Sequence, residues 1–187
     1  MRNIRLQKML EAAFMSALAM ILDLLPSIQL GPWISISFAM VPVFLIAYRW
    51  GTGTGLLTGF LWAMLQLVTG DAYIVHPIQF IIEYPIAFSV IGFAGIFARQ
   101  VKEHLLNGEK GKGLFYVIAG TFVGSFLRYF CHYLAGIIWF ASYAPEGQPV
   151  WLYSLIINGT SGLNSFILCA IVLSLILAIG PRLLKTN

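Results

Sequence analysis

Long apolar runs follow one another along almost the whole chain, separated only by short polar segments. Only 10% of the 187 residues are charged, whereas soluble domains carry about 25% charged residues. So few charges cannot cover a surface in water, and the sequence excludes a soluble globular fold. A bilayer-spanning helix takes about 20 apolar residues, so the chain has the length of one compact membrane bundle without a sizeable soluble domain. Any step driven by nucleotide hydrolysis is therefore expected to come from a partner protein.

The apolar runs predict an all-α membrane protein, a six-transmembrane-helix bundle. Pro26 ends the first run, Gly70-Asp71 closes the third, and Gly180-Pro181 ends the sixth. The second run is short for a full span, which predicts a tilted or partly re-entrant segment. We expect a single transmembrane domain over residues 1–187, with helices at about 9–25, 35–48, 53–69, 77–98, 113–141 and 152–179.

Basic side chains gather on one side of this predicted bundle. Of the 11 Lys and Arg residues, all except Arg128 lie in the two tails, after the second run, or between the fourth and fifth runs. The loops near 26–34, 70–76 and 142–151 contain none. The positive-inside rule therefore places the basic side, with both termini, in the cytoplasm. Because the sequence lacks a basic stripe interleaved with aromatic residues, no nucleic-acid partner is expected.

Small residues at four-residue spacing indicate places where two helix backbones approach closely within a membrane. The first run contains Ala13 and Ala17, and the third contains Gly51, Gly55 and Gly59. Each stripe can pack inside the bundle, or it can face outward and dock another membrane protein. The spacing alone leaves both interpretations open.

Away from the helix ends, three Glu, Arg or His side chains lie within the apolar runs, where charges are costly and mark either a site or a buried pair. Glu83 lies in the fourth run. Arg128 and His132 share one face of the fifth run, and the same stripe continues through Gly136 to Trp139. One helix face therefore carries a cation, an imidazole and a large aromatic ring, with no side chain at Gly136 between the last two.

Two interpretations of these residues stand side by side. Glu83 and Arg128 can form a structural ion pair, with His132 as a satisfied core histidine. That account leaves unexplained the polar tips of Tyr153 and Asn158 in the sixth run. An aromatic-lined cavity with one carboxylate instead suits a cationic, planar small molecule, because a ring stabilises a cation by about 0.5–2 kcal/mol. Such a cavity would open toward the outer loops, whose aromatic residues are Trp33, Tyr73, Tyr143 and Trp151.

Other chemistries have weaker support in the sequence. Glu83 and His132 could relay protons in a stand-alone proton-coupled carrier. The segment 158–162 lacks the Gly-x-Ser-x-Gly elbow of a serine nucleophile, which argues against an intramembrane protease. His76 and His104 have no Cys, Asp or Glu at ligand spacing, so no metal site is expected.

Several segments resemble one family of membrane proteins. These segments are Glu11–Ala19, Gly70–Ile74, Glu83-Tyr84, His132–Trp139 and Tyr153–Gly159, and the last two are the most specific. On these segments the chain resembles, over nearly its whole length, the S components of energy-coupling factor (ECF) vitamin transporters. In particular, it is similar to their thiamine-specific members.

The resemblance implies a substrate-binding subunit, without enzymatic activity or a cofactor, that captures thiamine at the outer face of a prokaryotic plasma membrane. Such a subunit lies in membrane lipid and docks on an ECF transmembrane coupling protein that carries two ATPase subunits. Ala13 and Ala17 match the family's docking motif for that coupling protein. The residues that match the thiamine site are Trp33, Tyr73, Glu83, Tyr84, His132, Gly136, Trp139, Tyr153 and Asn158.

The resemblance also implies roles for individual side chains. Glu83 would meet the charged ligand, and Arg128, where the family has a lysine, would be a supporting charge. Trp139 and His132 would stack on the ligand's rings. Trp33 would close the loop above, and Tyr153 and Asn158 would hydrogen-bond the ligand's polar edges. The alternatives are an S component for another vitamin and the stand-alone proton-coupled carrier.

Overall fold

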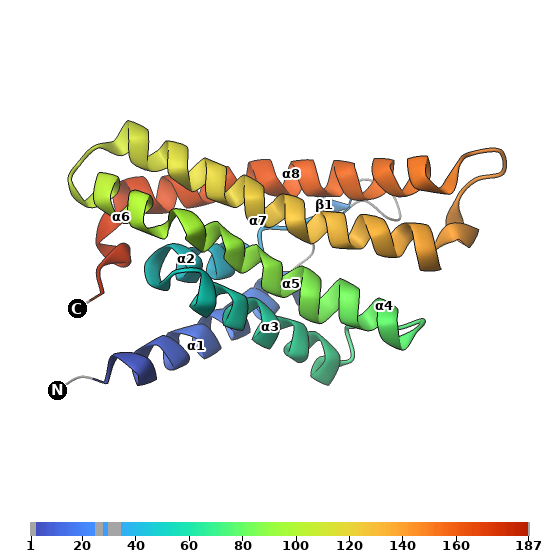
Figure 1. The fold of residues 1–187 in the computed structure, drawn as a ribbon, viewed down its shortest axis with the longest axis horizontal. Helices are drawn as coiled ribbons and strands as arrows, with labels where there is room; N and C mark the ends of the chain where they lie inside the picture. Colours follow the sequence, from blue (N-terminus) through green and yellow to red (C-terminus); the bar gives the residue numbers. More distant parts are fainter. Residues whose placement is uncertain (1–2, 25–27, 30–34, 187) are drawn as a thin grey trace.

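The chain folds into an elongated bundle of helices, seen in Figure 1, in a computed structural model that describes residues 3–24, 28–29 and 35–186. The first half comprises α1 (Ile4–Leu24), β1 (Ile28–Gln29), β2 (Ser35–Ile36), α2 (Val41–Trp50) and α3 (Thr52–Thr69). A continuous rod follows, made of α4 (Pro77–Ile81), the π-helix η1 (Ile82–Ile86), α5 (Ala87–Ser89), the 3₁₀-helix η2 (Val90–Phe97) and α6 (Ala98–Leu106). The last part comprises α7 (Lys110–Trp139), η3 (Ala141–Tyr143), α8 (Val150–Ile179) and η4 (Pro181–Leu184).

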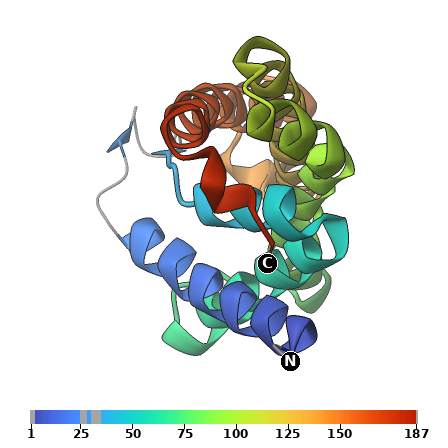
Figure 2. The same cartoon turned by 90° about the vertical axis from the view of Figure 1, so that its left-hand side faces the viewer.

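Three of these helical segments are long and apolar enough to cross a membrane, namely Pro77–Leu106, Lys110–Trp139 and Val150–Ile179. Each has 30 residues, which corresponds to about 45 Å of helix. The all-helical prediction is confirmed apart from one short pairing, in which β1 and β2 run antiparallel with Ile28 opposite Ile36. The beginning of α1 and the end of η4 lie at the same end of the bundle, as Figures 1 and 2 show. Six spans and cytoplasmic termini stay predictions.

The second predicted helix is shorter than expected and begins later. Residues 35–36 are extended, and α2 begins at Val41 with Pro42 in its first turn, where the missing N–H of proline costs nothing. Seven of the ten residues of α2 are buried, because α1, α3, η2, α6, α7 and α8 all contact it. A helix that is apolar on all sides belongs to a core, and α2 is the centre of this bundle.

Two glycines of the predicted stripe, Gly55 and Gly59, pack inside the bundle, whereas Gly51 lies before α3 and a Cβ there would meet nothing within 4 Å. A Cβ on Gly55 would lie 2.9 Å from the backbone of Gly92, and one on Gly59 would collide with the backbone of Phe88. Side chains at these positions would push α3 away from the α5–η2 part of the rod. Of the two interpretations that the spacing left open, internal packing is therefore the correct one for these glycines.

The alanine stripe of α1, Ala13 and Ala17, lies on the outer surface of the bundle. Ala12 and Ser16 are buried against the bundle, whereas Ala13 and Ala17 are exposed. Figure 2 shows α1 along the outside of the bundle. Leu10 and Phe14 extend the exposed apolar surface, so the side of α1 that carries Ala13 and Ala17 has no partner within the described part of this chain.

Candidate ligand-binding cavity

A cavity of about 390 Å³ lies between the α4–α5 part of the rod, α3, α7 and α8. Its wall combines ionisable, amide and aromatic side chains. The residues that line it are Gln66, Asp71, Tyr73, Glu83, Tyr84, Phe88, Arg128, His132, Gly136, Phe140, Tyr143, Tyr153, Ser154, Ile157 and Asn158. Seven of the nine residues that the sequence singled out for the ligand site are among them. Trp139 is not among them, and Trp33 lies outside the described residues.

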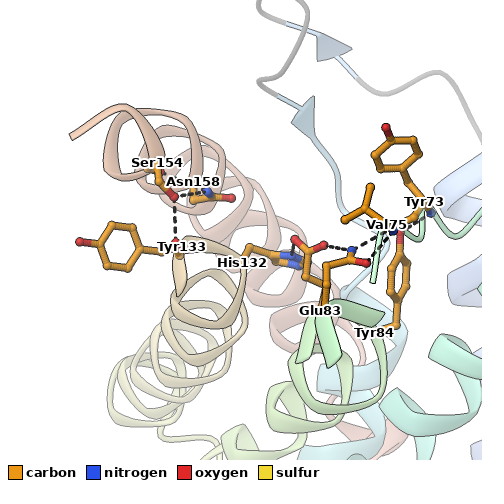
Figure 3. Close-up of polar contacts among 9 residues, drawn as sticks. Tyr73, Val75, Glu83, Tyr84, His132, Tyr133, Ser154 and Asn158 are labelled. Carbon is orange, nitrogen blue, oxygen red and sulfur yellow. Dashed lines mark hydrogen bonds and ion pairs between the residues drawn. The ribbon is translucent and has the colours of Figure 1, made fainter. Parts of the chain in front are cut away.

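Glu83 projects from the π-helix η1, which also contains Pro85. Proline removes a backbone donor, and such wide helical turns recur at functional sites. One carboxylate oxygen of Glu83 lies 3.3 Å from Nδ1 of His132 on α7. The other accepts a hydrogen bond from the Gln79 side chain. Figure 3 shows Glu83 and His132 pointing toward each other from their two helices.

The Gln79 side chain fixes the position of the Glu83 carboxylate. The sequence did not single out Gln79. It is completely buried, and its amide also donates to the carbonyl of Tyr73 at 3.1 Å and accepts from the amide of Val75 at 3.1 Å. The side chain therefore ties the Glu83 carboxylate to the loop before α4. Its position four residues before Glu83 on a helix is the signal that could have revealed it.

Aromatic rings form a second part of the wall. The Tyr84 hydroxyl accepts a hydrogen bond from the backbone N–H of Tyr73 at 2.7 Å. The Tyr73 ring stacks on Phe140, with centroids 6.2 Å apart and an angle of 28°. Its hydroxyl lies 3.4 Å from that of Tyr143, and this hydrogen bond raises the pKa of Tyr143. The Tyr143 hydroxyl therefore stays protonated at neutral pH.

Arg128 does not pair with Glu83, so the structural ion pair considered from the sequence is wrong for the described residues. Its guanidinium carbon instead lies 4.9 Å, 4.4 Å and 5.6 Å from the ring centroids of Trp62, Phe88 and Tyr129. Rings stabilise a cation through their negative faces. The Glu83 carboxylate is thereby left with hydrogen-bonding neighbours and without a Lys or Arg ion pair among the described residues.

On the α7–α8 side of the cavity, the missing side chain of Gly136 leaves space for Ser154 and Asn158. The Ser154 hydroxyl donates to the carbonyl of Tyr133 at 2.8 Å. The amide nitrogen of Asn158 donates to the carbonyl and the hydroxyl of Ser154, at 3.1 Å and 3.2 Å. Figure 3 shows this chain of contacts crossing from α7 to α8. It fixes the orientation of Asn158, which lines the cavity.

Replacing Gly136 with alanine should weaken ligand binding. The new Cβ would collide with the Ser154 hydroxyl and lie 3.3 Å from the Asn158 amide, so Ser154 and Asn158 would have to shift. A displaced hydrogen bond costs about 0.5–1.5 kcal/mol, which corresponds to a loss of several-fold in affinity. Calorimetry on the purified variant measures the loss. The matched control is Gly159→Ala, whose Cβ would meet only Leu155 at 3.9 Å, and equal effects of the two changes would contradict the role of Gly136.

One predicted site residue lies elsewhere. Trp139 stacks on His76 with centroids 5.9 Å apart, and it is not among the residues that line the cavity. Trp139 is the last residue of α7, and Phe140, which follows the end of the helix, lines the cavity instead. Trp33 falls outside the described residues.

Six further lining residues were not assigned to the site from the sequence, namely Gln66, Asp71, Phe88, Phe140, Ser154 and Ile157. Gln66 and Ser154 are buried polar residues, and their polarity inside apolar runs was the available signal. Phe88 lies one helical turn after Tyr84, and their rings stack at 5.7 Å. An apolar residue in an apolar run carries no such signal, so only the fold identifies Phe88.

Comparisons with known proteins agree along the whole chain. Residues 9–185 match the family described as thiamine transporter protein (Thia_YuaJ). The chain is 42% identical over 185 residues to the thiamine transporter ThiT of Bacillus subtilis (strain 168), which covers 98% of this chain and 96% of that protein. It is 36% identical over 177 residues to the thiamine transporter ThiT of Lacticaseibacillus paracasei (strain ATCC 334), with 93% and 88% covered. The solved structure of ThiT from Listeria monocytogenes superposes with a TM-score of 0.93 at 37% identity, covering 97% of this chain and 99% of that one.

Proposed function

This chain belongs to the thiamine transporter protein family, and from that premise we propose that it is the S component of an ECF-type transporter that binds thiamine in the cavity beside Glu83. It takes the vitamin from the outer face of a prokaryotic cell membrane. Partner subunits then use ATP to drive uptake. Residues 1–187 act as one transmembrane substrate-binding domain in this proposal.

The observation that carries the proposal is the environment of Glu83. Only 14% of its side chain is exposed, and its neighbours are His132 and Gln79, so no Lys or Arg within the described residues is ion-paired with it. Thiamine consists of a planar, cationic thiazolium ring that a methylene group joins to a polar aminopyrimidine ring. A desolvated carboxylate with no paired cation favours such a ligand, and the rings of Tyr84, Phe88 and Phe140 add surfaces on which a cation can stack.

The remaining site residues receive their roles by the same proposal. Tyr153 and Asn158 hydrogen-bond the polar edges of thiamine. Tyr73 and Tyr84 contribute hydroxyls and ring faces, and His132 stacks on the ligand beside Glu83. Trp139 and Trp33 are proposed to close over the ligand, with Trp139 turning from its contact with His76.

The transport partner is proposed from the exposed side of α1. Ala13 and Ala17 leave a shallow strip on the outside of the bundle, and small residues let a second helix approach closely in a membrane. Leu10 and Phe14 beside them are 61% and 68% exposed and supply apolar contact area. A transmembrane coupling protein that carries two ATPases docks on this strip in the proposed transporter.

Binding of thiamine to the purified protein tests the substrate. In detergent and without ATP, thiamine should bind tightly and quench tryptophan fluorescence, through Trp139 and Trp33 in particular. The protein–ligand titration is repeated with riboflavin and biotin, which lack the cationic ring. Heat and quenching with riboflavin or biotin, and none with thiamine, would reject thiamine as the substrate and favour an S component for another vitamin.

A further inference from the structure

The charge of Arg128 has no direct ion pair among the described residues, although Arg128 lines the cavity. Its Nε is buried without a hydrogen-bond partner. The rings of Trp62, Phe88 and Tyr129 surround the guanidinium but carry no net charge. A cation inside a membrane protein normally has a compensating anion nearby. An uncompensated one would oppose a cationic ligand in the same cavity.

Asp23 is a carboxylate near enough to Arg128 for the two charges to interact. It lies in the last turn of α1, outside the set of residues that line the cavity. Its carboxylate accepts a hydrogen bond from the Gln66 side chain and interacts electrostatically with Arg128. Asp71, at the cavity wall, is the like charge that also acts on it.

Helix α3 connects the two groups. Trp62 and Gln66 are four residues apart on α3 and so share one face. Trp62 carries the Arg128 guanidinium on its ring, and Gln66 holds the Asp23 carboxylate. Both α3 residues are buried. One face of α3 therefore contacts both charged groups, Asp23 through Gln66 and Arg128 through Trp62. Asp23 and Arg128 do not form a direct ion pair.

We propose that Asp23 is the counter-ion of Arg128 and thereby a specificity-determining positioning residue for cationic ligands, although it does not line the cavity. This inference rests on the proposed function. With Asp23 ionised, the charges of Asp23 and Arg128 cancel when seen from the ligand, and Glu83 sets the electrostatic preference of the cavity. Without the Asp23 charge, the Arg128 cation opposes Glu83, and a cationic ligand loses its advantage over a neutral one.

The experiment compares thiamine with its uncharged 3-deaza isostere, in which carbon replaces the quaternary nitrogen. Calorimetry gives the dissociation constant of each ligand for the purified wild type and for Asp23→Asn. Asp23→Asn should weaken thiamine binding by about tenfold, or about 1.4 kcal/mol, and change binding of the isostere by less than about twofold. The isostere thus also reports whether the variant is folded.

Two further variants separate charge from packing. Arg128→Gln added to Asp23→Asn should restore the wild-type ratio of the two dissociation constants, because both charges are then gone. The matched control is Glu11→Gln, the same chemical change near the other end of α1, where Glu11 pairs with Arg49. Glu11→Gln should leave the ratio of the dissociation constants of thiamine and its isostere unchanged.

The outcomes distinguish this inference from the proposed function. If wild-type protein binds neither thiamine nor the isostere, the proposed function fails. If wild type binds thiamine but Asp23→Asn weakens both ligands equally, Asp23 only supports the packing of α1 and the inference is wrong. Should Asp23→Asn not fold, Arg128→Gln alone gives the answer, since the unbalanced Asp23 charge should raise the preference for thiamine. An unchanged preference in that variant would overturn the inference.

Discussion

Glu83→Gln should weaken thiamine binding by more than tenfold, which is at least about 1.4 kcal/mol. The substitution keeps the shape of the side chain and removes its charge. The carboxylate is mostly buried and sits 3.3 Å from Nδ1 of His132, so water screens its attraction for a cation only weakly. The glutamine amide would also face the Gln79 amide that now donates to the carboxylate. Calorimetric titration with thiamine measures the effect.

The control for this substitution is Glu146→Gln, an acid-to-amide change at an exposed residue that does not line the cavity. Thiamine affinity should be unchanged in that variant. The 3-deaza isostere should lose less affinity than thiamine in Glu83→Gln. Equal thiamine affinity of Glu83→Gln and the wild type would show that Glu83 is not the counter-ion of the ligand.

Replacing both Ala13 and Ala17 with tryptophan should abolish thiamine uptake and leave thiamine binding intact. Both alanines are exposed on the outside of α1, so the bundle itself has room for larger side chains. Two indoles there would hold any docking helix several ångströms away, beyond the close approach that small residues permit. Uptake of radiolabelled thiamine by cells that hold the complete transporter measures transport, and calorimetry on the purified variant measures binding.

A matched control places tryptophans at the same spacing on another exposed helix face. Ile171 and Leu175 on α8 are 53% and 59% exposed, and Ile171→Trp with Leu175→Trp should preserve uptake. If the α1 variant still transports thiamine, this side of α1 is not the docking surface. Uptake by proteoliposomes that contain this chain alone, driven by a pH gradient, would instead support the proton-coupled carrier.

Much of the site could be predicted because polar residues within apolar runs are expensive and therefore informative. Glu83, His132 and Asn158 were all recognisable on this basis, and the structure brings them to one cavity. The partner of a charge was not predictable in the same way. Glu83 and Arg128 are an obvious pair by composition, yet Arg128 lies among three aromatic rings and Glu83 lies against His132 and Gln79.

The residues by themselves determined that the chain is a helical membrane protein, because the apolar runs leave too little charge for a surface in water. They also predicted a cationic ligand, since a carboxylate within an apolar run, among aromatic residues, favours one. The tertiary structure decided which side of each helix meets another. It buried Gly55 and Gly59 of α3 and left Ala13 and Ala17 exposed. It also set Asp23 against Gln66 and Arg128 over the ring of Trp62. The physical reason is that spacing along a helix defines a face, whereas what lies against that face depends on how distant segments pack.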